Sequence, residues 1–442
     1  MNPEYLTSGK PVEYSSVWML ALTWVLLLPL LVFASQTGFS FERGTGNTAV
    51  GAAEAGLSAT SSKEESNVVR YQVVAVYMLC CALMLPLARQ IIAEFRRDLL
   101  LTMLVTVAFA SMAWTQNPKE TILTSVYLAL DIGFSIYLLQ RLSANDLMKV
   151  LMLVGSAAAA ASIALIVLFP QFGLQSRGDY ALGTWQGIFT HKNICGEVFS
   201  YLLLPVFFVK MNGRFTVLIR YVYALVLLVI IGMTHSAGSW VICGATILSI
   251  ILFRVLAKRD RKDAAIIILV GFSCVSIVGV LVYQYMDVFL SFLGKDPTLT
   301  GRTTIWGLLF VSIMKRPLTG YGYMAFWQGM KGESANVAIP LNWPGIAYAE
   351  NGLLELWLEL GLIGVLLFVF AFFRAVRDGI YCFRRHATSE VMWYMSILAF
   401  TVFSNIEAGK VLSPSNLECI LQIVAFIGLR KERQLLQSQG AV

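Results

Sequence analysis

The sequence predicts an all-α polytopic membrane protein with about twelve transmembrane helices and a long extracytoplasmic loop between spans nine and ten. Of its 442 residues, 57% are hydrophobic and 13% are charged, whereas a soluble domain is about 45–50% apolar and about 25% charged. The apolar residues fall in long uninterrupted runs, each close to the roughly 20 residues that cross the hydrocarbon core as a helix. Short alternating segments, which would indicate a transmembrane barrel, are not seen in the sequence.

The apolar runs give the expected order of the spans. Two runs are short, and the pair around 221–256 can be divided in more than one way. The expected spans are residues 17–35, 71–88, 99–114, 121–139, 150–169, 194–209, 221–235, 238–256, 264–287, 352–372, 390–408 and 415–430.

The distribution of Lys and Arg predicts the orientation. With the N-terminus inside, about two thirds of the 33 Lys and Arg residues fall in cytoplasmic segments, as the positive-inside rule requires. We therefore expect a multi-pass membrane protein with both termini in the cytoplasm. The net charge of +7 is then an orientation signal, and no nucleic-acid partner is expected.

The chain divides into three expected parts. Residues 1–169 hold the first five helices and a flexible Gly-, Ala-, Ser- and Thr-rich outer loop at 36–69. Residues 170–430 form the remaining transmembrane core, which includes the outer loop at 288–351, and residues 431–442 form a cytoplasmic tail. The seven cysteines show no metal-ligand spacing and mostly lie in or beside apolar runs. We expect them to be small hydrophobic side chains, and we expect no metal site.

Polar residues gather in four regions, all outside in the expected orientation. The first, 170–193, places glycines and aromatic residues beside cations just before a span. An interfacial aromatic anchor with a snorkelling lysine is the alternative interpretation. The second, 234–240, is a junction of small, polar and aromatic residues, for which the alternative is a tight helical turn.

The third region is the long outer loop, 288–351, whose Gly and aromatic content argues against disorder. Long loops in compact proteins are usually functional or disordered. Residues 303–314 can form a helix that lies on or dips into the interface. In the fourth region, 404–410, Glu407 and Lys410 are three residues apart and can face each other. The alternative there is a local ion pair at a helix end.

Four acidic residues lie inside expected spans: Asp131, Glu197, Glu355 and Glu359. A charge inside a span is costly and usually points into a polar cavity. A proton or ion relay in a secondary transporter is therefore an alternative function. A transporter would also predict inverted repeats, and no internal repeat is visible in the sequence.

The order of motifs resembles that of the O-antigen ligase and polymerase superfamily (Wzy type). A Gly- and aromatic-rich loop ends in His191, Lys192 and Asn193, and a Ser- and Gly-rich hairpin follows. Gly-Arg-x-x-x-Trp at 301–306, Pro-x-x-Gly-x-Gly at 317–322 and the helix start at 351–364 come next. An exit that contains Asn and Glu follows last. The resemblance covers roughly residues 170–425, and the His-Lys-Asn form is most similar to exopolysaccharide polymerases.

The resemblance implies a glycan polymerase that needs no cofactor or metal. Such an enzyme transfers a polysaccharide chain from a polyprenyl diphosphate to the hydroxyl of a lipid-linked repeat unit, with inversion, on the outer face of the inner membrane. A ligase that transfers O-antigen to lipid A core is the alternative within the family. The implied partners are the lipid-linked donor and acceptor, membrane lipids, and partner proteins of polysaccharide export.

Cations in the outer regions suit a diphosphate leaving group. Arg302 and Arg177 can each offer a bidentate donor fork, and Lys192 can add a point charge. The other residues assigned to substrate binding are His191, Asn193, Trp185, Trp306, Tyr321, Asn351, His235, Glu407 and Lys410. Aromatic residues at this face can stack on sugars, although aromatic residues at an interface need no such role.

Glu350 is the expected catalytic base, and it departs from the family pattern. Many members have His directly before the Asn-Gly of this helix start, where this chain has Glu350. A carboxylate also accepts a hydroxyl proton. Its ordinary pKa of about 4.3 is low for that task, so burial or nearby negative charge would help. The hairpin also has His235 and Ser236 where many members have Arg. The sequence leaves open whether Glu350 is a natural variant, a shifted mechanism or an engineered substitution.

Overall fold

The structure is a computed structural model. It describes residues 16–35, 61–175, 183–259, 302–343, 345–407 and 411–439. Within these ranges the chain forms helices and no extended strand. The span expected at 264–287, the first part of the long outer loop, Arg177 and Lys410 lie outside them.

The N-terminal helices follow the expected spans, except that α2 begins at Ser61, ten residues before the expected start and inside the loop expected at 36–69. They are α1 (Ser16–Ser35), α2 (Ser61–Met84), α4 (Leu99–Ala110), α5 (Pro118–Arg141) and α6 (Ala144–Leu168). A short helix that the apolar runs do not predict, α3 (Ala88–Arg97), joins α2 to α4. Its polar sequence explains the omission, since only Ile91 of its residues is buried.

The C-terminal helices also coincide with expected spans. They are α8 (Lys192–Leu202), α9 (Arg214–Met233), α10 (Ala237–Leu256), α15 (Gly352–Arg385), α16 (Ser389–Glu407) and α17 (Leu417–Gln439). Residues 234–236 form a short turn between α9 and α10, as the hairpin interpretation predicts. Helix α15 continues well past the expected end at residue 372.

Among the described residues, six helices are long and apolar enough to cross a membrane. These are Arg70–Arg97, Pro118–Arg141, Ala144–Leu168, Arg214–Met233, Ala237–Leu256 and Gly352–Arg385. Helix Leu22–Ser35 and two other apolar helices are shorter. The predicted class, a polytopic all-α membrane protein, is therefore confirmed. The count of twelve spans stays a prediction, as do the orientation and the side of each loop.

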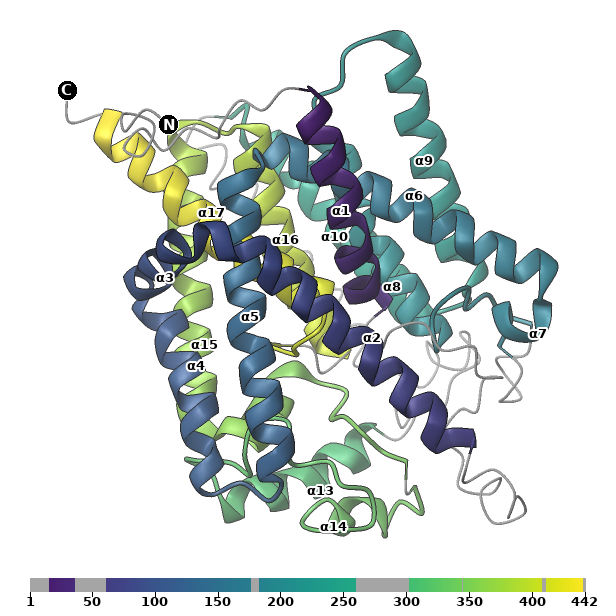
Figure 1. Cartoon of the computed structure of the whole chain (residues 1–442), viewed down its shortest axis with the longest axis vertical. Helices are drawn as coiled ribbons and strands as arrows, with labels where there is room; N and C mark the ends of the chain where they lie inside the picture. Colours follow the sequence, from purple (N-terminus) through teal and green to yellow (C-terminus); the bar gives the residue numbers. More distant parts are fainter. Residues whose placement is uncertain are drawn as a thin grey trace.

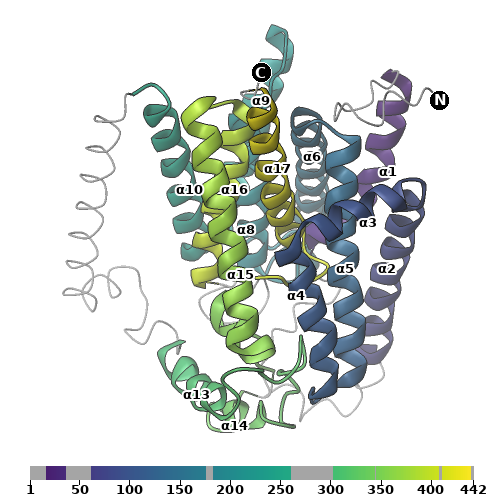
Figure 2. The ribbon, with the colours of Figure 1, turned by 90° about the vertical axis from the view of Figure 1, so that its left-hand side faces the viewer.

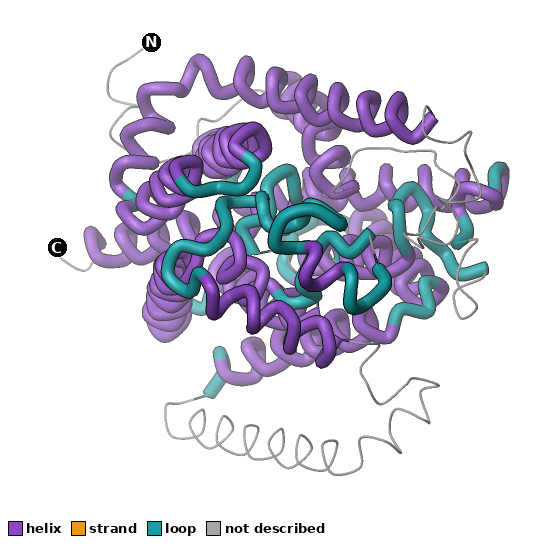
Figure 3. Tube along the Cα trace, turned by 90° about the horizontal axis from the view of Figure 1, so that it is seen from below, coloured by secondary structure: helices purple, strands orange, loops and turns teal. Residues whose placement is uncertain are grey.

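Most helices run roughly parallel in a bundle, and short elements cover one end of it. Helices α13 (Arg302–Lys315) and α14 (Ala335–Ala338) lie at the lower end, with the start of α15 above them (Figures 1 and 2). Figure 3, seen from that end, shows loops and short helices across the middle of the bundle. We call residues 302–350 the cap. The start of α1 and the end of α17 lie at the opposite end (Figure 1).

Helix α17 forms the centre of the bundle. It packs against α15 and α16 and also against α5 of the N-terminal half. Residues 417–429 are all buried, as expected of a helix that is apolar on every side. The two halves of the chain therefore share one core.

A buried acid fixes the loop between α16 and α17. Asp131 of α5 accepts hydrogen bonds from the Tyr77 hydroxyl at 2.9 Å and from the Ser415 amide at 3.0 Å. The Ser135 hydroxyl donates to the Ile420 carbonyl at 3.0 Å. A buried polar group costs free energy unless it is hydrogen-bonded. Asp131 is thus satisfied by structural partners, and it holds residues 415–420 against the N-terminal half.

Ion pairs join helices at the end opposite the cap. Asp98, which is only 1% exposed, pairs with Arg374 at 2.7 Å and with Arg430 at 2.9 Å. Arg430 also contacts Glu94 of α3. These contacts tie α3 and α4 to α15 and α17.

Candidate functional site

Arg302 and Glu350 meet where the cap joins the bundle. The Arg302 Nη2 atom lies 2.9 Å from Glu350 Oε2, and the two side chains are 23% and 20% exposed. One turn along α13, the Trp306 indole N–H donates to the Ala349 carbonyl at 2.9 Å. The first turn of α13 is therefore fastened to the residues just before α15, although 48 positions separate the pair in sequence.

The start of α15 presents Glu350 through a special backbone conformation. Glu350 has φ of 54°, in the left-handed region, which is uncommon for a residue other than Gly, Asn or Asp. Asn351 then caps the helix, because its side-chain oxygen accepts from the amides of Leu353 and Leu354, both at 3.1 Å. Asn351 thus has a structural role beside any contact with substrate.

Gly352 lets the start of α15 pack closely against the end of α16. A Cβ atom at this position would lie 2.2 Å from Asn405 Oδ1, which is far inside contact distance. The Asn405 amide in turn donates to the Thr401 carbonyl at 2.9 Å. Asn405, from the fourth polar region, is therefore a direct neighbour of the helix start that carries Glu350.

Glu355 and Glu359 hold the cap onto α15. Glu355 accepts hydrogen bonds from the Trp327 indole N–H and the Ala349 amide, both at 2.6 Å. Glu359 accepts from the Met324 amide. The two residues are only 6% and 3% exposed. These hydrogen bonds explain why Glu355 and Glu359 lie inside an expected span, and no ion pathway is needed to explain them. Much of the sequence support for a transporter function is therefore removed.

The two motifs at 317–322 and 351–364 form one structural unit. Helix α15 breaks at Gly361, which has φ of 66° and ψ of −169°. The cap segment supplies hydrogen bonds to the interrupted turn: the Leu362 amide donates to the Pro317 carbonyl at 2.8 Å. In return, the Leu358 and Glu359 carbonyls accept from the amides of Tyr321 and Gly322, at 2.8 and 2.9 Å.

Glycine is required at the break in α15. A Cβ atom at Gly361 would lie 2.1 Å from the Leu318 carbonyl oxygen, and one at Gly320 would lie 2.6 Å from the Glu359 carbonyl. Side chains other than glycine also avoid the backbone conformation of Gly361. The glycines of both motifs therefore have a packing role.

The first two polar regions meet at the start of α8. His191 is the N-cap, and its Nδ1 accepts from the Asn193 amide at 3.1 Å. Burial and the adjacent Lys192 ammonium lower the pKa of His191. The Lys192 Nζ atom lies 3.5 Å from the His235 carbonyl, and the Ser239 hydroxyl donates to the Asn193 carbonyl at 3.2 Å. His191, Lys192, Asn193 and His235 are thus neighbours, as their joint assignment to one face requires.

Two of the aromatic residues predicted to bind substrate, Tyr321 and Trp185, make hydrogen bonds to neighbouring elements of the fold. Tyr321 is only 2% exposed, and its hydroxyl donates to the Ser312 carbonyl at 2.7 Å. A sugar cannot lie on that ring while α13 covers it, so its assignment to sugar stacking is not supported by this geometry. The Trp185 amide donates to the Met233 carbonyl at 3.1 Å, which joins its loop to the end of α9.

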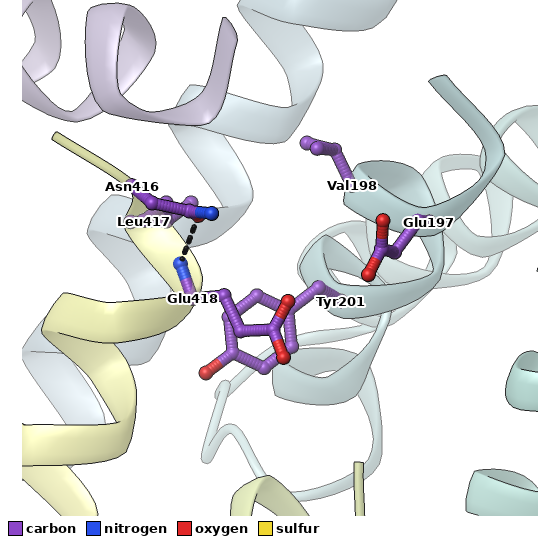
Figure 4. A pocket seen from close by; sticks show the side chains of 6 residues that line it. All are labelled: Glu197, Val198, Tyr201, Asn416, Leu417 and Glu418. Atoms are coloured by element: carbon purple, nitrogen blue, oxygen red, sulfur yellow. Dashed lines mark hydrogen bonds between the residues drawn. The ribbon is translucent and has the colours of Figure 1, made fainter. Parts of the chain in front are cut away.

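A small cavity lies inside the bundle, between α8 and the start of α17. Glu197, Val198 and Tyr201 of α8 line one side, and Asn416, Leu417 and Glu418 line the other (Figure 4). Its volume of about 10 Å³ is the space of one water molecule. Glu418 also accepts hydrogen bonds from the Ser404 hydroxyl and, at 3.4 Å, from the Asn405 amide. A buried polar cluster therefore reaches from α8 to the neighbour of Gly352.

Sequence reasoning missed Glu418 and Tyr201. The signal for Glu418 was present, because it is an acid inside the apolar run 415–430, as Asp131 is inside its own span. Tyr201 gave no comparable signal. Among the earlier candidates, Arg177 and Lys410 lie outside the described residues, and α16 ends at Glu407, whose side chain also lies outside them. Within the described ranges, no group of three or more His, Cys, Asp or Glu side chains could hold a metal ion.

Residues 222–369 match the family model described as O-antigen ligase. The matched segment contains the Arg302–Glu350 pair and the unit around Gly361. This part of the chain, about a third of its length, is similar to the O-antigen ligase family. This confirms the resemblance of the motifs. His191, Lys192 and Asn193 lie before the matched segment, whereas their neighbour His235 lies within it.

A second similarity is to the exopolysaccharide production protein ExoQ of Rhizobium meliloti (strain 1021). The two sequences are 34% identical over 98 residues, which is 22% of this chain and 22% of that protein. The chain therefore aligns with about a fifth of the length of ExoQ.

Proposed function

We propose that this protein is a glycan polymerase that acts on lipid-linked substrates. It transfers a polysaccharide chain from a polyprenyl diphosphate to a hydroxyl of a lipid-linked repeat unit, at the outer face of the inner membrane. The observation that carries the proposal is the Arg302–Glu350 ion pair, 2.9 Å long, within the segment that matches the O-antigen ligase family. The pair combines a cation that can stabilise the diphosphate leaving group with a carboxylate that can accept the proton of the attacking hydroxyl.

Arg302 stabilises the leaving group in this proposal. When the bond between the anomeric carbon and the diphosphate oxygen breaks, the electron pair stays on that oxygen. A guanidinium has several N–H donors in a fixed fork and can contact a phosphate oxygen while it still binds Glu350. Donors aimed at the site where charge develops lower the barrier most. Lys192 at the start of α8 is the second candidate cation, and Arg177 is a third.

Glu350 accepts the proton of the acceptor hydroxyl as that oxygen attacks the anomeric carbon. The new glycosidic bond forms on the face opposite the leaving diphosphate, so the configuration inverts. The carboxylate is 20% exposed, which lets a substrate hydroxyl approach it. The Arg302 contact orients the side chain, and the left-handed backbone at Glu350 directs it out of the helix start.

Two features favour a polymerase over a ligase. The His191-Lys192-Asn193 sequence resembles exopolysaccharide polymerases, and the relative ExoQ is described as an exopolysaccharide production protein. A ligase to lipid A core remains the second candidate, because the matching family model is that of O-antigen ligase. Partner proteins of polysaccharide export and the orientation with both termini in the cytoplasm belong to the same proposal.

Glycan analysis of a strain that lacks this gene tests the proposal. A lost polymerase leaves single lipid-linked repeat units, and a plasmid copy restores long chains. Polymer that stays on its lipid carrier would indicate a ligase instead. Unchanged glycans together with altered solute uptake would contradict both and point to a transporter.

A further inference from the structure

An open groove lies at the end of α13 that is far from Glu350. Its walls are Trp114, Lys315, Arg316, Pro317, Leu318 and Thr319, and its volume is about 520 Å³. Helix α13 has 14 residues, so its two ends are about 20 Å apart at about 1.5 Å per residue. The groove is therefore separate from the Arg302–Glu350 pair. It lies between the cap and Trp114, which follows the short 3-10 helix Ser111–Ala113 at the end of α4.

The groove carries positive charge. Lys315 pairs with Glu333 at 2.6 Å, so these two side chains offset each other. Arg316 is exposed, and its Nη1 donates to the Trp114 carbonyl at 3.2 Å while the guanidinium lies 5.2 Å from the centre of the Tyr321 ring. These contacts hold the guanidinium in place. Because a guanidinium has several N–H donors, the bond to Trp114 leaves donors for an anion. One net positive charge remains among the three side chains.

An apolar stripe on α15 begins at the groove. The Ile363 amide contacts the Leu318 carbonyl at 3.4 Å, and Ile363 is the first of four exposed apolar side chains on one face of the helix. The stripe consists of Ile363, Leu366, Phe370 and Phe373. Spacings of three and four residues place these side chains above one another. The stripe is about 15 Å long at about 1.5 Å per residue, which equals half of the roughly 30 Å hydrocarbon core.

We infer that this groove binds the phosphodiester headgroup of a glycerophospholipid, with an acyl chain along the stripe on α15. The single negative charge of a phosphodiester complements the net charge of the groove. Exposed Leu318 lies between the cations and the stripe, where a headgroup gives way to its acyl chains. Trp114 lines the same groove, and tryptophan is enriched at membrane interfaces. The lipid fastens the cap to the membrane at the end of α13 that faces away from Glu350.

Native mass spectrometry of the purified full-length protein tests this site. The probes are phosphatidylglycerol, a diacylglycerol with the same acyl chains, and inorganic phosphate. We expect saturable binding of phosphatidylglycerol, much weaker binding of diacylglycerol, and no displacement by millimolar phosphate. Arg316→Gln should weaken phosphatidylglycerol binding by about tenfold or more, as expected for loss of a charge-assisted hydrogen bond.

A matched pair of variants separates charge from packing. Leu318→Asp and Leu318→Asn have nearly the same shape and leave Arg316 untouched, and only Leu318→Asp adds a negative charge to the groove. We expect Leu318→Asp to lose the lipid and Leu318→Asn to bind it within about threefold of the unchanged protein. Lys331→Gln removes an exposed charge of the cap that does not line the groove, and it should bind normally.

Three outcomes would overturn the inference. Equal binding by Leu318→Asp and Leu318→Asn would show that charge in the groove is irrelevant. An equal loss in Lys331→Gln would show general attraction to the cap. Complete displacement by phosphate would indicate a site for a free anion and not for a lipid. None of these measurements depends on glycan transfer, so the result is independent of the proposed activity.

Discussion

Arg302 and Glu350 are held together by a contact of 2.9 Å between Nη2 and Oε2, at the joint between α13 and α15. Each therefore determines how the other meets a substrate. The guanidinium orients the carboxylate, and the carboxylate fixes the guanidinium beside the cap.

Arg302→Ala should abolish growth of long glycan chains while the protein level stays normal. Loss of one preorganised donor to a developing negative charge typically costs about 100-fold or more in rate. The measurement is the length distribution of glycan in a complemented deletion strain. Arg302→Lys keeps the charge but not the donor fork and should retain partial function. Normal long chains in the Arg302→Ala strain would remove Arg302 from the mechanism.

Glu350→His should preserve or raise polymerisation if this position holds the base. The imidazole has an ordinary pKa of about 6.5, closer to neutral than that of a carboxylate. Glu350→Gln is the matched control, because it keeps the shape and cannot accept the proton. Full activity of Glu350→Gln with no activity of Glu350→His would show that another group serves as the base.

Gly361→Ala should destabilise the protein and loosen the cap. The added methyl group would meet the Leu318 carbonyl at 2.1 Å, and the backbone conformation alone costs about 1–3 kcal/mol. Thermal unfolding of the purified protein measures the effect. Gly307→Ala on α13 is the control, because nothing lies within 4 Å of its added methyl group. Equal stability of the two variants would contradict the proposed unit of residues 317–322 and 351–364.

The stability of the α8 start should fall at acidic pH. Burial and Lys192 lower the pKa of His191 in the folded protein, so the unfolded chain takes up this proton first. The stabilising contribution of neutral His191 is therefore complete above the ordinary histidine pKa of about 6.5. It is lost as the pH falls through the lower pKa of His191 in the folded protein. His191→Asn retains a capping side chain that does not titrate. Its unfolding temperature should depend less on pH between about 5 and 7, and an unchanged pH dependence would refute this role.

The orientation can be measured with single cysteines in a background without the native ones. Thr190 and Arg259 are both exposed and lie at opposite ends of the described bundle segments. A maleimide that cannot cross the inner membrane should label Thr190→Cys in intact cells and should label Arg259→Cys only after lysis. The reverse pattern would place the cap and the Arg302–Glu350 pair in the cytoplasm.

The apolar runs determined the fold class and most helix positions, because the need to bury about 20 residues in hydrocarbon overrides local detail. They failed for α3, whose polar sequence carries no such signal. They also could not give the break in α15. The Asn351–Gly364 sequence is typical of one continuous helix. The chain can interrupt it only because the Pro317 carbonyl accepts a hydrogen bond from α15 and the Tyr321 and Gly322 amides donate hydrogen bonds to α15.

The sequence by itself determined which functional groups the protein contains: a basic cap that includes Arg302 and Glu350, and a helix that starts with His-Lys-Asn. Only the tertiary structure decided how they combine. It paired Arg302 with Glu350 across 48 positions. It also made Glu355 and Glu359 the acceptors that hold the cap on α15, and it buried Tyr321 under α13. The physical reason is that ion pairs and backbone hydrogen bonds between distant segments depend on geometry that local composition does not encode.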